Sequence, residues 1–348
     1  MQVYSARNPA RYLFVPVEGP VVLFEYAGCA HLAEGLDTVD EVRPATAISY
    51  FFTHDKLGAS TERWADEIDA LARECRTGDR IALESGTPAS AFALGRRGYD
   101  VADAQAPLEQ ARCIKVPNEL KMIRSSLRAV EEGVQHLERS ISPGKTENEV
   151  WSELHRHLIA TGGDYVETRL MNSGPRTNPW FSECGDRALN AGDLVALDTD
   201  VVGRHGYFAD FSRTFLCGDR DPTDAQKRLY QLAYEQVQTN LRALRPGMSF
   251  RDYAEETWKI PAPYKSRRYF ALAHGAGMNG EYPYIVHRED LDAHGYDGII
   301  EPGMTLCVES FIGHEDGGEG VKLEEQVYVG EDRVELLSDY PFDERLLA

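Results

Sequence analysis

The sequence predicts an α+β protein in which a smaller α/β domain precedes a larger domain. In residues 1–106, apolar runs typical of strands alternate with an amphipathic helical pattern, as in a small α/β domain. Beyond residue 116, three long helical segments carry clear start signals, and strand-like runs separated by glycine turns fill the rest. We therefore expect helices packed against a largely antiparallel sheet in the larger domain.

The smaller domain is predicted from short runs of strand-forming residues. β-Branched and aromatic residues dominate these runs, and the segment 60–75 has the apolar periodicity of a helix. The expected strands are 12–18, 20–26, 46–52 and 80–85. We place the domain boundary near 110–116, which divides the chain into domains 1–112 and 113–348.

The helices of the larger domain are predicted from their first residues. Pro117 opens the first helix, because proline is favoured at the first helical position, and this helix ends at the breaker 141–145. Capping boxes begin the two others: Thr146 with Glu149, and Thr223 with Gln226. The expected strands are 165–171, 194–200, 206–215, 268–274, 304–310 and 321–330.

Composition and charge exclude several classes of protein. No run of 18 or more apolar residues exists, so we expect no transmembrane helix, and the first residues lack the order of a signal peptide. The formal net charge of −20 argues against nucleic acid as a partner, because phosphate binding needs basic residues. The six cysteines form no CxxC pair and are expected to be free thiols. We expect a cytoplasmic protein.

Three aspartates lie in the segment 197–215, which otherwise reads as two strands around a turn. Asp198 and Asp200 are two positions apart and would share one face of a strand, and Asp210 would return beside them on the next strand. Carboxylates gathered on one face repel one another unless a proton or a cation separates them, and hard divalent ions prefer carboxylate oxygen. The alternative is that these aspartates form turns and exposed edge charges.

His274, Glu309 and Glu324 are the partners expected from the later strands. His274 ends an apolar strand before glycines, and each glutamate lies inside a strand-like run. Taken singly, the histidine suits a hydrogen-bonded core position, and each glutamate suits an exposed strand position. Together with the aspartates they indicate a two-metal site, since imidazole adds affinity for Mn, Fe, Co or Zn. Such a site activates water or substrate and stabilises developing negative charge.

In this order, the acidic residues and the histidine resemble those of the pita-bread metallopeptidases, which include prolidases, aminopeptidases P, creatinases and methionine aminopeptidases. The motifs DFSRTF, HGAG and EPGMTLCVE carry the resemblance, which covers about 115–340. It implies a C-terminal pita-bread fold, a smaller N-terminal α/β domain and two bound divalent metal ions. The implied ligands are Asp198, Asp210, His274, Glu309 and Glu324, with Asp210 and Glu324 as bridges.

The spacing of the aspartates resembles one subgroup of this family, the dimethylsulfoniopropionate lyases of the DddP type. Asp198 and Asp200 precede Asp210 by twelve and ten positions, whereas the peptidases usually separate their two aspartates by eleven. The segments 167–187 and EPGMTLCVES also look like this subgroup. The resemblance implies that Asp200 is a sixth ligand and that the metal is iron. Relatives of this subgroup extend further at the N-terminus, so either the start is truncated or the first domain is a reduced version.

Other positions depart from the patterns of both groups. Trp180 stands where the peptidases carry a histidine, and no second histidine follows shortly after His274. Gly280 stands where the lyases carry an aspartate proposed as the base. The adjacent Glu281 is therefore the candidate replacement for that base.

Aromatic residues supply the candidate substrate contacts. Tyr269 matches a tyrosine near the pocket of the lyases. With Trp180 and Tyr282 it would form an aromatic wall suited to a cationic or apolar group. The alternative is that these rings belong to the core.

The sequence leaves three functions open. The first is a dinuclear-metal-dependent hydrolase of the Xaa-Pro dipeptidase type, which acts on a small dipeptide-like or amide substrate and uses Glu309 for proton transfer. The second is a lyase that releases dimethyl sulfide from a sulfonium acid. The third is a binding module without catalysis. The candidate catalytic residues are Glu309, His274 and Glu281, the cofactor is two divalent ions (Mn, Fe, Co or Zn), and the expected assembly is a homodimer that binds a small molecule.

Overall fold

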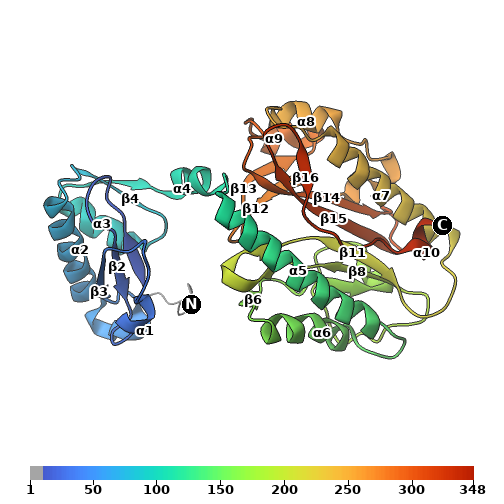
Figure 1. Cartoon of the computed structure of the whole chain (residues 1–348), viewed down its shortest axis with the longest axis horizontal. Coiled ribbons are helices and arrows are strands. Elements are labelled where there is room, and N and C mark those ends of the chain that lie inside the picture. The colour runs from blue at the N-terminus through green and yellow to red at the C-terminus, as the bar shows by residue number, and fades with distance from the viewer. Residues whose placement is uncertain (1–10) are drawn as a thin grey trace. The chain divides into compact units, whose positions relative to one another are not determined.

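The computed structural model describes residues 11–348, which divide into two compact units, 11–108 and 109–348 (Figure 1). Each unit has its own hydrophobic core. No helix within the described range is both long and apolar enough to cross a membrane.

The first unit is a small α/β arrangement. Its three-stranded sheet pairs β1 with β2 antiparallel and β2 with β3 parallel, and β4 pairs parallel with β5. Side chains of β2, α2 and α3 form the core, among them Phe24, Trp64 and Leu94. The elements are β1 (Tyr12–Phe14), β2 (Val22–Glu25), β3 (Glu41–Pro44), α1 (Tyr50–Thr53), α2 (Leu57–Glu74), β4 (Arg80–Leu83), α3 (Pro88–Arg96) and β5 (Asp100–Asp103). Helix α4 (Gln105–Arg112) follows.

The strand expected at 46–52 is wrong. The segment ends in helix α1, in which the Thr53 hydroxyl donates a hydrogen bond to the Ser49 carbonyl over 2.8 Å. Of its apolar residues, Ile48 packs on the core, whereas Tyr50 and Phe51 are exposed. Residues that favour strands did not form a strand here, because the Tyr50 and Phe51 side chains do not pack on the face of a sheet.

The second unit joins a long antiparallel sheet to two smaller ones. The five-stranded sheet has the order β13-β12-β14-β15-β16, and the smaller sheets have the orders β11-β8-β7 and β10-β9-β6. The described strands of these three sheets pair antiparallel, as expected. The strands are β6 (Tyr165–Val166), β7 (Met171–Ser173), β8 (Leu194–Asp198), β9 (Val201–Val202), β10 (Phe208–Ala209), β11 (Ser212–Leu216), β12 (Ala271–Ala276), β13 (Gly280–Val286), β14 (Thr305–Gly313), β15 (Gly320–Val329) and β16 (Val334–Leu336).

Three long helices cover these sheets, and their starts are those that the sequence predicted. Pro117 is the first residue of α5, and Thr146 and Thr223 accept hydrogen bonds from the backbone of Glu149 and Gln226. Helix α7 lies along β14 and β15, while α5 and α6 lie on the side of β8 and β11 (Figure 1). The helices are α5 (Pro117–Ser140), α6 (Glu147–Ala160), α7 (Asp224–Ala243), α8 (Phe250–Glu256), α9 (Leu291–His294) and α10 (Glu344–Leu347). The expected α+β class is therefore confirmed.

Strand register brings the acidic residues of the second unit together. Glu309 of β14 stands opposite Glu324 of β15, and Asp198 of β8 stands opposite Ser212 of β11. Directly opposed side chains lie on the same face of a sheet, with their Cβ atoms about 4.5–5.5 Å apart. The fold thus places carboxylates against one another, which is unfavourable without compensation.

Candidate metal centre

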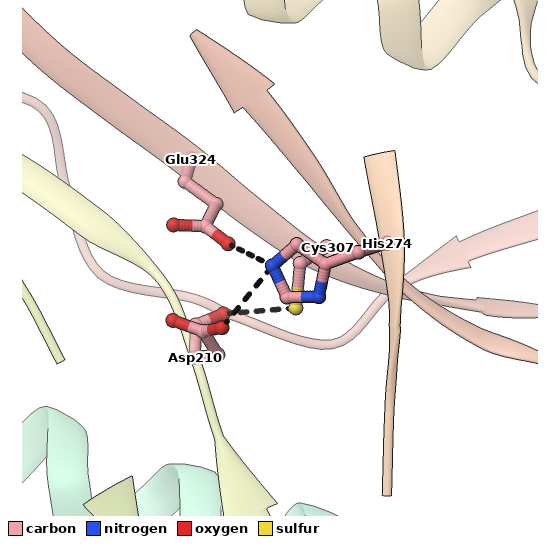
Figure 2. Close-up of side chains that lie close together, drawn as sticks. All are labelled: Asp210, His274, Cys307 and Glu324. Carbon is pink, nitrogen blue, oxygen red and sulfur yellow. Dashed lines mark hydrogen bonds and ion pairs between the residues drawn. The ribbon is translucent and has the colours of Figure 1, made fainter. Parts of the chain in front are cut away.

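All six predicted ligand residues meet in the second unit. One ligand atom each from Asp198, Asp200 and Asp210 lie within 4.8 Å of one another. Nε2 of His274 lies 3.5 Å from Asp210 Oδ2, 3.3 Å from Glu309 Oε1 and 3.8 Å from Glu324 Oε1. Figure 2 shows the His274 ring between Asp210 and Glu324. We call the five carboxylates with His274 and Lys322 the carboxylate cluster.

Asp200 reaches the cluster differently from what a strand would predict. Strand β8 ends at Asp198, and Asp200 adopts a left-handed conformation with φ of 41° in the turn before β9. Aspartate tolerates this conformation better than most residues. The Thr168 hydroxyl donates a hydrogen bond to Asp200 Oδ2 and fixes the carboxylate. A turn, rather than strand alternation, therefore gathers Asp198 and Asp200.

Lys322 is a member of the cluster that the sequence did not reveal. Its fully buried ammonium donates to Glu309 Oε2 over 2.6 Å and to Glu324 Oε2 over 2.8 Å, and it lies 3.2 Å from Asp198 Oδ2. It also contacts the Ser212 hydroxyl at 2.7 Å. The available signal was position: Lys322 is two residues before Glu324 on β15 and so shares its face.

Three buried carboxylate oxygens in the cluster have no hydrogen-bond partner among the described residues: Asp210 Oδ1, Glu309 Oε1 and Glu324 Oε1. Nδ1 of His274 donates to the Gly275 carbonyl over 3.0 Å, and Nε2 faces the carboxylates of Asp210, Glu309 and Glu324. Burying an unpaired polar group costs about 1–3 kcal/mol, and more for a charge. This donor set fits a divalent cation, which would satisfy the oxygens and the imidazole together.

The pKa values in the cluster reflect its excess of negative charge. Burial raises the pKa of Asp200 to about 8, and the charge of Asp198 adds to the effect. Burial and Glu324 likewise raise the pKa of Asp210 well above its ordinary value. Burial alone would lower the pKa of His274, but the Glu309 carboxylate 3.3 Å from Nε2 and the nearby Glu324 raise it to about 9. Positive charge is therefore strongly favoured at this place.

Two of the three predicted aromatic contacts lie together. Trp180 and Tyr269 share a small apolar cluster, and the Tyr269 ring centroid lies 4.7 Å from Lys322 Nζ. Phe181, which sequence reasoning missed, is half exposed, stacks on Tyr269 at 5.3 Å and has φ of 76°. A bulky residue with positive φ is an outlier that often marks a functional site.

The structure does not place Tyr282 with these rings. It stacks on Tyr296 at 5.8 Å and contacts Phe250. A register irregularity between His274 and Gly275 shifts the pairing of β13, so Tyr284 rather than Tyr282 stands opposite His274. The structure thus brings Trp180 and Tyr269 together and leaves Tyr282 apart from them.

Glu281, the candidate base, is engaged elsewhere. Its carboxylate is buried in an ion pair with Lys115 and lies 3.4 Å from Arg112 Nε. Burial raises the pKa of Glu281, and the two cations offset part of that rise. Both carboxylate oxygens are nevertheless occupied, Oε1 by Lys115 and Oε2 by Arg112, so neither is free to accept a proton from a substrate. A Cβ added at the neighbouring Gly280 would meet no atom within 4 Å, so the position of the lyase aspartate is open.

Comparison with known proteins gives a family for this arrangement. The pattern of metallopeptidase family M24 matches residues 121–331. A dimethylsulfoniopropionate lyase, DddP, from Roseobacter denitrificans is 34% identical over the full chain and 79% of its own length. A Xaa-Pro dipeptidase from Pyrococcus furiosus is 25% identical over 66% of this chain and 64% of that protein. The solved Xaa-Pro dipeptidase from Bacillus anthracis superposes with a TM-score of 0.77 at 20% identity, covering 96% of this chain and 88% of that one.

Proposed function

The chain belongs to metallopeptidase family M24, and from that premise we propose that it is a metal-dependent hydrolase of a small dipeptide-like or amide substrate. The observation that carries the proposal is the group of buried carboxylates of Asp210, Glu309 and Glu324, each of which has an oxygen without a hydrogen-bond partner and an oxygen within 3.8 Å of His274 Nε2. The proposed ligands of two divalent ions are Asp198, Asp200, Asp210, His274, Glu309 and Glu324. A bound ion would supply Lewis-acid chemistry and lower the pKa of water.

Glu309 is the residue that we assign to proton transfer. Its Oε2 is held by Lys322 over 2.6 Å, which fixes the carboxylate, while its Oε1 has no hydrogen-bond partner. A general base needs a free oxygen within hydrogen-bond reach of the proton that it accepts. Lys322 thus orients Glu309, and Oε1 receives the proton. Tyr269, whose ring lies 4.7 Å from Lys322 Nζ, and the exposed ring of Phe181 supply an aromatic surface for the apolar part of a substrate.

A second candidate, a lyase that releases dimethyl sulfide, is favoured by the presence of Asp200 in the cluster and by the 34% identity to DddP. Against it stands Gly280, because the position of the proposed base carries no side chain and Glu281 is ion-paired. A hydrolase that takes its proton acceptor from Glu309 does not need that base. We therefore prefer the hydrolase to the lyase.

The two functions are separated by parallel assays of the protein loaded with Mn(II) or Fe(II). We expect proline release from Xaa-Pro dipeptides and little dimethyl sulfide from dimethylsulfoniopropionate. Glu309→Gln should abolish proline release, and Gly280→Asp, which the open space accommodates, should leave it unchanged. Dimethyl sulfide release that exceeds hydrolysis, and rises further in Gly280→Asp, would instead establish the lyase. The homodimer and the cytoplasmic location stay predictions.

A further inference from the structure

The structure adds a sulfur atom to the predicted donors. Cys307 lies on β14, two residues before Glu309, and therefore points to the same face of the strand. It is fully buried, and Figure 2 shows its sulfur beside the His274 ring and Asp210. One ligand atom each from Asp210, His274, Cys307 and Glu324 lie within 4.8 Å of one another.

The size of this group suits a single ion. Metal bonds to sulfur and to imidazole nitrogen are about 2.0–2.3 Å long, so two donors on opposite sides of an ion lie about 4–4.6 Å apart. The four donor atoms therefore need only a small contraction to surround one ion. Asp210 Oδ1 and Glu324 Oε1, both buried and without a partner, point independently to a cation between them.

Packing alone accounts for only one side of Cys307. On that side the thiol contacts a small apolar cluster with Val202, Phe208 and Ala276. On the other side, its only polar contact within residues 11–348 is a weak one at 3.6 Å to the backbone carbonyl of Asp210. Among residues 11–348, no other cysteine belongs to a group of possible metal ligands. Cys217, for example, is equally buried but lies in the core cluster that α5 and α6 share with β8 and β11.

We propose that Cys307 is a metal ligand, whose sulfur completes a shell of one nitrogen, one sulfur and two carboxylate oxygens with His274, Asp210 and Glu324. The sulfur–metal bond replaces the sulfur–hydrogen bond, and the proton leaves to solvent. Thiolate and imidazole donors favour Zn(II), Co(II) and Fe(II), whereas Mn(II) and Mg(II) favour oxygen. The second position, beside Asp198 and Asp200, offers only carboxylate oxygen and suits a harder ion. The inference rests on the metal centre of the proposed function, but not on its substrate.

Cobalt provides the test, because a Co(II)–thiolate bond gives a charge-transfer band in the near ultraviolet. Metal-free protein is titrated with Co(II), and bound cobalt is counted by elemental analysis. We expect the band in the wild type and in Cys217→Ser, and its loss in Cys307→Ser, a nearly isosteric change. Cys307→Ser should also weaken Zn(II) binding by roughly tenfold or more, with a smaller change for Mn(II).

The outcomes distinguish this inference from the proposed function. Wild-type protein that binds cobalt without the band would overturn the thiolate ligand and leave the metal centre intact. Retention of the band in Cys307→Ser would do the same. Failure of the wild type to bind any divalent ion would overturn the metal centre, and this inference with it. If Cys307→Ser does not fold, the wild-type spectrum alone still decides.

Discussion

Two buried charged clusters occupy opposite faces of the same two strands, β11 and β15. In one cluster positive and negative charges are equal in number, whereas the other has an excess of carboxylates. Ser212 and Glu324 face the carboxylate cluster, whereas their neighbours Arg213 and Glu325 face a second group. We call this second group, Arg213 with Glu325, Ser338 and Tyr340, the arginine cluster. The alternation of side chains along a strand makes two such clusters from adjacent residues.

The arginine cluster is saturated. Arg213 donates from Nε to the Tyr340 carbonyl over 3.0 Å, from Nη1 to the Ser212 and Glu324 carbonyls, and from Nη2 to Glu325 Oε1 over 2.8 Å. The Ser338 hydroxyl donates to the other oxygen of Glu325. The Arg213 guanidinium also lies 4.3 Å from the Phe342 ring centroid. One positive charge meets one negative charge, and the structure needs nothing further there.

The carboxylate cluster is not saturated. Five carboxylates face one ammonium and one imidazole, and three oxygens have no partner among the described residues. Burial of charge therefore does not by itself mark a functional site. Buried charge without a partner in the protein is the better sign of a functional site, because only a bound ligand can neutralise it.

The largest effect on stability is expected in the saturated cluster. Arg213→Ala leaves Glu325 buried without its cation, which should lower the free energy of unfolding of this unit by about 3–5 kcal/mol. Hydrogen exchange of the β15 amides under increasing urea measures it. Arg245→Ala, which breaks an exposed pair with Glu256, is the matched control and should cost at most about 1 kcal/mol. Equal losses in both variants would remove the distinction between the clusters.

The next effect is stabilisation by metal, which only the unsaturated cluster allows. Divalent ion at 100 times its dissociation constant should stabilise the wild type by about 2.7 kcal/mol. Asp210→Ala removes the carboxylate shared by both groups of ligands and should show no stabilisation and no bound metal. Two metal ions per chain in purified Asp210→Ala, counted by elemental analysis, would contradict the site.

The sequence allows the proposed ligand residues to be found because most of them are acidic or imidazole side chains placed where a strand should be apolar. Asp198, Glu309 and Glu324 break strand patterns that are otherwise buried, which is detectable from the chain alone. Lys322 also interrupts the apolar pattern of its strand, but the sequence does not show which carboxylates the lysine will contact. Those contacts depend on the register of β14 with β15 and of β11 with β8.

The failures have the same physical origin. Tyr282 is predicted to share an aromatic wall with Trp180 and Tyr269, but it packs against Tyr296 and Phe250. The irregular pairing of β12 with β13 puts Tyr284, not Tyr282, opposite His274. Glu281 was considered available, but Lys115 lies 166 positions away in sequence and holds its carboxylate. Contacts of this kind are set by tertiary packing, which local patterns do not contain.

A smaller effect, of opposite sign to that of Arg213→Ala, is expected from neutralising an acid in the unsaturated cluster. Asp210→Asn keeps the shape of the side chain but removes a charge from among like charges. The metal-free variant should therefore be more stable than metal-free wild type by about 0.5–2 kcal/mol, as is common when a functional site is relieved of strain. Thermal denaturation near pH 8 in the presence of a chelator measures this. A less stable variant would show that the cluster is balanced without metal.

The smallest effect is a difference between pH profiles. Asp200 has a pKa of about 8 in the folded protein, above the ordinary value of about 3.9. Between these values the unfolded chain has released a proton that the folded chain retains, so the stability of the metal-free protein falls as pH rises. His274 acts in the same direction: the raised pKa of about 9 contributes stability that is complete below about pH 6.5 and is lost as pH rises through 9.

Thermal denaturation of the metal-free protein from about pH 5 to 9 should therefore show a steady loss of stability across the window that these pKa values define. Asp200→Asn should make the loss shallower, by a modest amount because Asp200 is partly exposed and water screens its charge. Bound metal should flatten the profile further, since the folded protein then keeps its carboxylates ionised at every pH tested. A metal-free profile that rises with pH, or one that Asp200→Asn leaves unchanged, would mean that protons do not take the place of the cation in this cluster.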